Sequence, residues 1–357
     1  MFSQLTALLF LVKPVTVRIS EVEQYMSAPT DSSVSSQPGP VLPELRTLGT
    51  TDIRVTAIAM GCWPIAGITT QGVTWPRSLA TLQAAFDAGI NFFDTAYCYG
   101  YEGESERLIA EALGHVRDKI VIASKGGIHW SADRVQVKDG RPETIIRQCE
   151  ESLQRLGTDV IDLYYLHSPD PQVPVEISAE AFLRLFEQGK IRSAGLSNAT
   201  LEQLSAFHRV CPLSAYQPRY NMVQREIEQS QLPWCRENEV SCIVYWPLMK
   251  GLLAGHYPRE HVFPPADSRH KYAVFQGQEW QRNQDLLDEL KAIATRCDLS
   301  VARLVLQWTI QRQGITSALC GAHRPEQIQE NAFAMVGKLS HEALLEIESA
   351  IARRDLS

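Results

Sequence analysis

The feature that most constrains the fold is a regular alternation of short apolar segments with longer amphipathic segments, which begins after Leu45. The short segments are rich in β-branched and aromatic residues, as strands are, and the longer ones carry apolar residues at helical spacing. Strands are predicted at residues 54–60, 91–95, 119–125, 160–167, 191–197, 214–217, 241–246 and 316–320. Helices are predicted at residues 77–90, 105–116, 142–157, 178–189, 201–210, 226–238, 283–297, 301–312 and 325–336.

Strands that alternate with helices must pair in parallel, because each helix carries the chain back to the edge from which it started. Eight such units within about 290 residues fit a closed (β/α)8 TIM barrel of the α/β class. An open doubly wound sheet usually carries G-x-G-x-x-G after its first strand, but "GCWPIAG" stands there instead. We therefore predict a single barrel domain over residues 45–357, with a β-hairpin-like start and a C-terminal helix.

Residues 1–44 differ from the rest of the chain. The apolar stretch "LTALLFLV" is too short to span a bilayer, and it lacks the preceding positive charges of a signal peptide. Residues 27–44 are rich in Ser and Pro, which is typical of disordered chain. We expect residues 1–44 to be a disordered extension, or partly an artefact of the assigned start, because Met26 offers an alternative one.

Charge and cysteine content exclude several classes of function. The net charge of -7 leaves no basic excess for nucleic acid or an anionic membrane. The eight cysteines form no C-x2-C or C-x4-C pair, so reduced thiols in the cytoplasm are expected rather than disulfides or zinc. No His, Cys and Asp cluster has the spacing of metal ligands, and we predict no metal.

Polar residues stand where the predicted strands end, at Asp94, Lys125, His167, Ser197, Asn198 and Gln217. Taken singly, Asp94 and Lys125 are equally compatible with a structural ion pair. A histidine such as His167 is, taken alone, more often a hydrogen-bonded core residue than a catalyst. In a (β/α)8 barrel, however, the carboxyl ends of all strands meet at one rim, and the active site lies there. Together these residues therefore predict a functional site.

At these positions the chain resembles the aldo-keto reductases, which are NAD(P)H-dependent carbonyl reductases built on a (β/α)8 barrel. "DTAYCYG" resembles the D-T-A-x-x-Y of that family, "VIASK" its strand-ending lysine, and "DLYYLH" its histidine strand. "GLSN", "YQPRYN" and "PEQIQEN" are similar to its cofactor-binding segments. The resemblance covers residues 45–331, and "HSPDPQVPVE" and "PLMKGLLAGHY" look closest to a bacterial subgroup of general-stress and inositol-cluster proteins.

The resemblance implies a catalytic tetrad of Asp94, Tyr99, Lys125 and His167. Carbonyl reduction needs a hydride at carbon and a proton at oxygen, and Tyr99 would supply the proton. Lys125 would lower the pKa of that phenol from about 10. Asp94 would hold Lys125, and His167 would polarise the substrate carbonyl. The neighbouring Tyr97 would line the substrate pocket instead.

The resemblance also implies a cofactor site. Nicotinamide would contact Gly61, Cys62, Trp63, Ser197, Asn198, Gln217 and Tyr245. Pyrophosphate would lie along Trp246, Pro247, Leu248 and Gly251, and adenosine would meet Gly321, Gln327, Glu330 and Asn331. Taken alone, "PEQIQEN" favours an amphipathic surface helix over a cofactor site.

Two departures bear on the choice of cofactor. Trp246 stands where relatives often carry a small hydroxyl residue, and Cys320 and His323 replace residues that usually accompany a 2′-phosphate. Arg324, Lys250 and Arg269 can still supply positive charge, so NADP is predicted rather than NAD.

Trp63, Tyr97 and Trp130, with the loop 126–141, would form the substrate pocket, although both tryptophans are equally compatible with packing roles. The predicted function is NADP-dependent reduction of a small-molecule aldehyde or ketone, and an oligomer is compatible with the sequence. Two alternatives stay open. One is a redox-sensing regulatory module that binds NADP(H) with little turnover, and the other is a barrel lyase or isomerase without nicotinamide.

Overall fold

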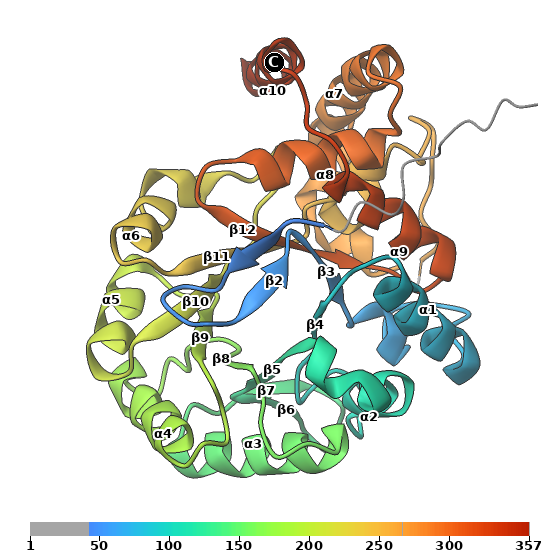
Figure 1. Ribbon diagram of the computed structural model, residues 1–357. Coiled ribbons are helices and arrows are strands. Elements are labelled where there is room, and N and C mark those ends of the chain that lie inside the picture. Colours follow the sequence, from blue (N-terminus) through green and yellow to red (C-terminus); the bar gives the residue numbers. More distant parts are fainter. Residues whose placement is uncertain (1–42, 266, 357) are drawn as a thin grey trace, which may run out of the picture. The chain divides into compact units, whose positions relative to one another are not determined.

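Eight parallel strands close into a barrel at the centre of the fold (Figure 1). They are β3 (Ile58–Gly61), β4 (Phe92–Asp94), β5 (Val121–Gly126), β8 (Leu163–Leu166), β9 (Ala194–Ser197), β10 (Leu213–Gln217), β11 (Ser241–Tyr245) and β12 (Ile315–Gly321). Each strand pairs with its neighbours in chain order, and β12 pairs with β3 to close the ring. The computed structural model describes residues 43–265 and 267–356, so the expectation for residues 1–44 falls outside it except at Pro43 and Glu44.

Helices follow the strands and surround the barrel (Figure 1). They are α1 (Trp75–Asp87), α2 (Glu104–Leu113), α3 (Pro142–Leu156), α4 (Val175–Glu187), α5 (Leu201–Val210), α6 (Gln231–Glu237), α8 (Val301–Gln311) and α9 (Pro325–Ala332). Two further helices, α7 (Gly277–Arg296) and α10 (His341–Leu356), pack against each other outside this ring. Short 3₁₀ turns lie at Pro64–Ala66, Gly114–Lys119, Glu226–Gln229, Met249–Ala254, Ser268–Lys271, Ala273–Phe275 and Phe333–Met335.

Local sequence sets the ends of several helices. Helix α5 begins with a capping box, in which Thr200 accepts from the amide of Gln203 while the Gln203 side chain accepts from the amide of Thr200. Helix α3 has proline in its first turn and ends at Gly157, whose φ of 62° is left-handed. Such an ending favours glycine, which has no Cβ to clash.

A hairpin of β1 (Leu45–Thr47) and β2 (Arg54–Thr56) lies across the barrel (Figure 1). Its residues Leu48, Ile53 and Val55 are at most 2% exposed and pack inside the barrel with Phe92 and Leu163, which begin their strands. The hairpin thus fills the amino-terminal end of the barrel, where burial of each large apolar side chain contributes roughly 1.5–3 kcal/mol. The carboxyl ends of the strands, at the opposite end, remain for a functional site.

The structure confirms the (β/α)8 barrel, the hairpin-like start and the C-terminal helix. Three expectations differ in detail. The predicted strand 54–60 is divided between hairpin strand β2 and barrel strand β3, and the Thr56 hydroxyl bridges the break by donating to the carbonyl of Ile58 at 2.7 Å. The loop 126–141 contains a small antiparallel sheet of β6 (Ile128–Trp130) and β7 (Gln136–Lys138). The predicted helix 226–238 is interrupted at Ser230.

Within residues 43–265 and 267–356, no helix is both long enough and apolar enough to cross a membrane. The same residues contain no group of three or more His, Cys, Asp or Glu side chains arranged to hold a metal ion. All eight cysteines are free thiols, and only Cys297 among them is not buried.

Candidate active site

Two strand-end side chains and one loop tyrosine meet inside the carboxyl end of the barrel. Lys125, on β5, places Nζ 2.5 Å from Oδ1 of Asp94, the last residue of β4. The same nitrogen donates to the carbonyl oxygen of Thr95 at 2.8 Å and lies 3.5 Å from the hydroxyl of Tyr99. Strand order explains the meeting, because β4 and β5 are hydrogen-bonded neighbours and Tyr99 lies in the loop that follows β4.

Asp94 and Lys125 form an ion pair buried from solvent. Burial raises the pKa of Asp94, and the Lys125 ammonium and the Gln217 amide oppose that rise because both stabilise the carboxylate. Gln217 donates from Nε2 to the second carboxylate oxygen at 2.8 Å. Both oxygens of Asp94 are therefore engaged, which fixes the direction in which Lys125 points.

Tyr99 is a partly buried phenol flanked by two rings. Its ring centroid lies 5.1 Å from that of Trp63 and 5.8 Å from that of His167, and both contacts are edge to face. Burial raises the pKa of Tyr99 well above 10, and the negative charge of Asp94 adds to the rise. The net shift is therefore opposite to the lowering expected from Lys125, chiefly because burial disfavours the phenolate. Tyr99 is held as the neutral, proton-bearing phenol.

His167 follows β8 and is held in its neutral form. Burial lowers its pKa well below 6.5, and the positive charges of Lys125 and Lys138 lower it further. Its backbone amide donates to the carbonyl of Gly126 at 2.9 Å, and its own carbonyl accepts from Asn198 at 3.1 Å. A neutral imidazole carries one N–H donor, which suits it to polarise a carbonyl without first losing a proton.

The residues expected at the nicotinamide carboxamide share one part of the rim. Ser197 ends β9 and donates to the backbone carbonyl of Gln217 at 2.8 Å. Asn198 is exposed, has a left-handed φ of 57°, and accepts from the Tyr245 hydroxyl at 2.7 Å. The structure therefore brings these four predicted residues together and links them by hydrogen bonds.

The end of β3 reaches the same rim, although its residues differ in accessibility. Gly61 and Trp63 are partly exposed, and the Trp63 indole donates to the hydroxyl of Thr69 at 2.7 Å. Cys62 is completely buried, and its amide donates to the carbonyl of Asp94 at 2.9 Å. Its side chain is thus inaccessible to a ligand. Cys62 contributes to the predicted site only by holding the backbone of Asp94.

The segment after β11 has an irregular backbone. Trp246, Lys250 and Gly251 have φ values of 59°, 52° and 90°. Lys250 Nζ lies 4.6 Å from the ring centroid of Trp246 and 4.9 Å from that of Tyr272. These three side chains, with Arg219 and Lys271, line a cavity of about 260 Å³. Three cationic side chains from different segments therefore surround a cavity beside the predicted pyrophosphate segment.

Other members of the predicted pyrophosphate set differ in their surroundings. Pro247 is buried, whereas Leu248 and Gly251 are partly exposed. Arg269 donates from Nε to Asp267 at 2.9 Å, and its guanidinium lies over the Phe263 ring. The charge of Arg269 is thus committed to Asp267, so it contributes little to the binding of an anion.

Gly321 ends β12, and the other residues expected at adenosine lie along α9. The amide of His323 donates to Oε1 of Gln327 at 3.1 Å, Glu330 accepts from Ser300, and Asn331 is buried. Burial lowers the pKa of His323, and the positive charges of Arg324 and Arg77 lower it further. Arg77, on α1, was not predicted, because nothing in its local sequence indicates that α1 lies beside α9.

Trp130 and Tyr97 were both expected at the substrate, but their hydrogen bonds lie in different directions. The Trp130 indole donates to the carbonyl oxygens of Cys98 and Gly100, each at 2.9 Å, so it fixes the loop that carries Tyr99. The Tyr97 hydroxyl donates to Glu151 on α3 at 2.6 Å, and the Arg155 guanidinium lies 4.3 Å from its ring centroid. The structure therefore directs the Tyr97 hydroxyl toward α3, and its expected place in the substrate pocket stays a prediction.

A buried charge network beneath this loop was missed from the sequence. Glu106, on α2, is completely buried and accepts from the Ser124 hydroxyl at 2.6 Å. Arg155 reaches both Glu106 and the carbonyl of Tyr97, each at 3.3 Å. The sequence does not predict this contact, because Glu106 and Arg155 lie on two separate predicted helices and charged residues there are usually exposed.

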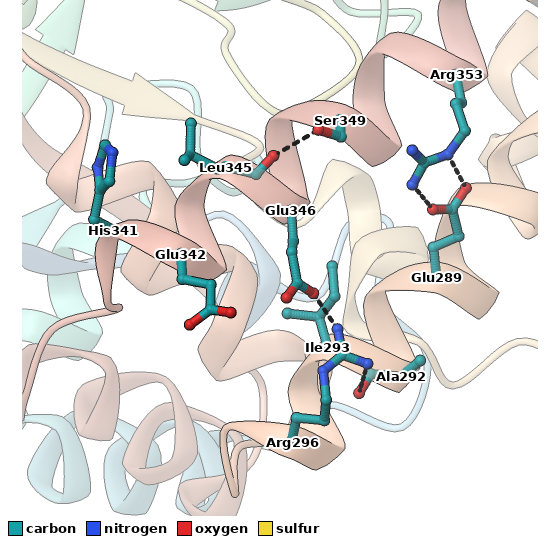
Figure 2. Close-up of a pocket in the computed structure, with 10 residues that line it drawn as sticks. All are labelled: Glu289, Ala292, Ile293, Arg296, His341, Glu342, Leu345, Glu346, Ser349 and Arg353. Atoms are coloured by element: carbon teal, nitrogen blue, oxygen red, sulfur yellow. Dashed lines mark hydrogen bonds and ion pairs between the residues drawn. The ribbon is translucent and has the colours of Figure 1, made fainter.

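A groove of about 630 Å³ lies elsewhere, between α7 and α10 (Figure 2). Its charged side chains pair across the groove, Arg296 with Glu346 and Arg353 with Glu289. None of the predicted site residues lines it. The candidate active site is therefore the barrel rim, where the ion pair of Asp94 and Lys125 lies beside Tyr99 and His167.

Comparison with known proteins agrees with this geometry. The sequence pattern of the Aldo/keto reductase family matches residues 57–352. Aldo-keto reductase YhdN of Bacillus subtilis (strain 168) is 36% identical over 289 residues, which is 80% of this chain and 87% of the relative. The NADH-specific methylglyoxal reductase of Escherichia coli (strain K12) is 32% identical over 82% of this chain and 94% of its own.

Among solved structures, glycerol dehydrogenase AKR11B4 from Gluconobacter oxydans superposes with a TM-score of 0.82. The match has 32% identity and covers 87% of this chain and 95% of that one. The family pattern, the relatives and the barrel rim lead to one conclusion. The chain belongs to the aldo/keto reductase family of oxidoreductases, which act on small-molecule carbonyl substrates.

Proposed function

We propose that this protein is an NADP(H)-dependent reductase of aldehydes or ketones, with Tyr99 as the general acid. The observation that carries the proposal is the meeting of Asp94, Lys125 and Tyr99, with Nζ of Lys125 3.5 Å from the phenol oxygen. A proton donor beside a buried cation, in a site that also holds a neutral histidine, is the chemistry that protonation of a carbonyl oxygen requires.

The residues at the rim fit a nicotinamide. Asn198 is exposed at the strand ends with an amide donor and acceptor, and Tyr245 beside it is half-buried. A carboxamide needs partners of this complementary kind, and an aromatic ring can cover the flat face of the nicotinamide. When bound, the reduced cofactor supplies the hydride that adds to the carbonyl carbon.

The side chains of this chain then handle the oxygen. His167 and Tyr99 donate hydrogen bonds to the substrate oxygen and orient it, as preorganised donors do in other oxyanion sites. The alkoxide that forms on hydride addition is a stronger base than a phenolate, so Tyr99 gives up its proton despite its raised pKa. Lys125 stabilises the resulting phenolate, and its ion pair with Asp94 holds it in place.

NADP is proposed over NAD because of the positive charge at the start of α9. Arg324 and Arg77 both act on His323 at this helix N-terminus, which itself favours anions. Arginine binds phosphate through two parallel hydrogen bonds, and the 2′-phosphate is the group that NAD lacks. The name of the Escherichia coli relative, an NADH-specific enzyme, makes this choice worth a direct test.

The test is a titration of the purified protein with NADPH and with NADH, followed by fluorescence. Absorbance loss is then measured with a panel of small aldehydes, ketones and sugars. We expect tighter binding of NADPH and turnover of at least one carbonyl compound. Binding of neither nucleotide would contradict the proposal in favour of a lyase or isomerase, and binding without turnover across a broad panel would favour a redox-sensing module.

A further inference from the structure

Cys98 lies against the imidazole of His167, with its sulfur 3.6 Å from Nδ1. It directly precedes Tyr99, is only 1% exposed, and packs with Ala96 and Ile128. Its backbone is fixed as well, because its carbonyl accepts from the Trp130 indole. The contact between sulfur and ring is therefore held from both sides and is not a chance approach of two mobile side chains.

The direction of this hydrogen bond follows from the state of both groups. Burial raises the pKa of Cys98 to about 12, so the group is a thiol throughout the neutral range. Burial also keeps the His167 ring neutral, so one of its nitrogens is an acceptor and the other a donor. A thiol sulfur is a weak acceptor, whereas the unprotonated nitrogen of a neutral imidazole is a good one. The favoured arrangement therefore has the S–H as the donor and Nδ1 of His167, 3.6 Å away, as the acceptor.

We propose that Cys98 is a positioning residue for carbonyl reduction, whose thiol donates to Nδ1 of His167 and so keeps the ring hydrogen on Nε2. In a neutral histidine, the hydrogen bond made by one nitrogen decides which tautomer is present. Among the described residues, Nε2 has no hydrogen-bond partner, so it is the nitrogen left for a substrate oxygen. This role presupposes the proposed function of the site.

The tautomer of His167 decides whether its ring donates a hydrogen bond to the substrate oxygen or repels that oxygen. With hydrogen on Nε2, the ring and the Tyr99 hydroxyl are both donors toward the substrate oxygen, which can accept two hydrogen bonds. With hydrogen on Nδ1, a nitrogen lone pair would face an oxygen that gains negative charge during hydride addition. Cys98 would therefore act on kcat through His167 without touching the substrate or the cofactor.

The experiment compares Cys98→Val, Cys98→Ala and Cys98→Ser with the wild-type protein. Val keeps most of the volume without a donor, Ala covers the case in which Val fails to fold, and Ser restores an O–H donor. Cys235→Val is the matched control, because Cys235 is an equally buried thiol on α6 outside the barrel rim. Each protein is labelled with ¹⁵N-histidine, and proton–nitrogen correlation spectra give the tautomer of His167, assigned by the loss of its signal in His167→Gln.

We expect hydrogen on Nε2 in the wild-type, Cys98→Ser and Cys235→Val proteins. The Nδ1–H form should rise in Cys98→Val or Cys98→Ala, with kcat about three- to tenfold lower and NADPH affinity unchanged, as for the loss of one hydrogen bond. A wild-type ring with hydrogen on Nδ1, or a Val or Ala variant that keeps both tautomer and kcat, would overturn the inference. Because the spectra need no turnover, absence of carbonyl reduction in the wild-type protein would contradict the proposed function alone.

Discussion

The ammonium of Lys125 lies 2.5 Å from a carboxylate oxygen of Asp94, and neither side chain is more than 2% exposed. An ion pair this deeply buried repays its desolvation only when its remaining hydrogen bonds are made. Gln217 and the carbonyl of Thr95 supply them. The pair therefore has a fixed direction, and that direction presents the cation to the hydroxyl of Tyr99.

Substitution of Asp94→Asn should destabilise the protein by about 3–5 kcal/mol, because it leaves the Lys125 charge buried without a counterion. Urea unfolding measures the free energy, and the reduction rate is measured on the folded fraction, where we expect at least a tenfold loss. Asp162→Asn is the control, since Asp162 is buried and paired with Arg117 and Arg192 at the start of β8. It should lose stability but keep its rate. Wild-type stability of Asp94→Asn would show that the pair is not ionised.

Stability should fall as the pH drops below about 6.5, because of His167. Its pKa is lowered in the folded protein, so the unfolded chain binds the extra proton first. The stability contribution of the neutral ring is complete above the unfolded pKa and is lost as the pH falls toward the folded value. His167→Gln should flatten the pH dependence of the urea midpoint between pH 7.5 and 5. An equally steep dependence in that variant would assign the effect to other groups.

Arg324→Ala should weaken NADPH binding about tenfold and leave NADH binding nearly unchanged, which corresponds to one charge-assisted hydrogen bond. Fluorescence titration with each nucleotide gives both dissociation constants. Lys338→Ala removes one exposed cation from a loop before α10 and should change neither constant. A loss shared equally by NADPH and NADH would place Arg324 at a part of the cofactor common to both.

Trp130→Phe should lower kcat about tenfold at constant NADPH affinity, because two hydrogen bonds to the Tyr99 loop are lost. Steady-state kinetics and nucleotide titration separate the two effects. Trp75→Phe also removes an indole donor, that to Glu111 on the outer surface, and should keep its rate. A rise in KM alone would return Trp130 to the substrate-contacting role expected from the sequence.

The order of strands and the strand-end residues could be predicted from sequence because both follow from periodicity. Once β4, β5 and β8 are neighbours in a barrel, Asp94, Lys125 and His167 must share a rim. The direction of a side chain in an irregular loop follows no such rule. Tyr97 and Tyr99 differ by two residues, yet Tyr97 turns to Glu151 and Tyr99 to Lys125.

The net shift of the Tyr99 pKa is opposite to the one expected from the sequence. The expectation counted the Lys125 charge, which motifs reveal, but not burial of the phenol, which only the packed structure reveals. The sheet of β6 and β7 was missed for a related reason. Its two strands have only three residues each, which is too short for alternation to identify them from local pattern.

The most direct test of the account compares Tyr99→Phe with Tyr97→Phe in carbonyl reduction by NADPH. Each change removes one phenol oxygen from the same loop, but only the Tyr99 oxygen lies within 3.5 Å of Lys125 Nζ. Loss of a general acid costs about 10²–10⁴ in rate. We predict that loss in kcat for Tyr99→Phe with unchanged NADPH affinity, and near wild-type kcat for Tyr97→Phe. An active Tyr99→Phe variant, or an inactive but folded Tyr97→Phe variant, would contradict the assignment of Tyr99 as the proton donor.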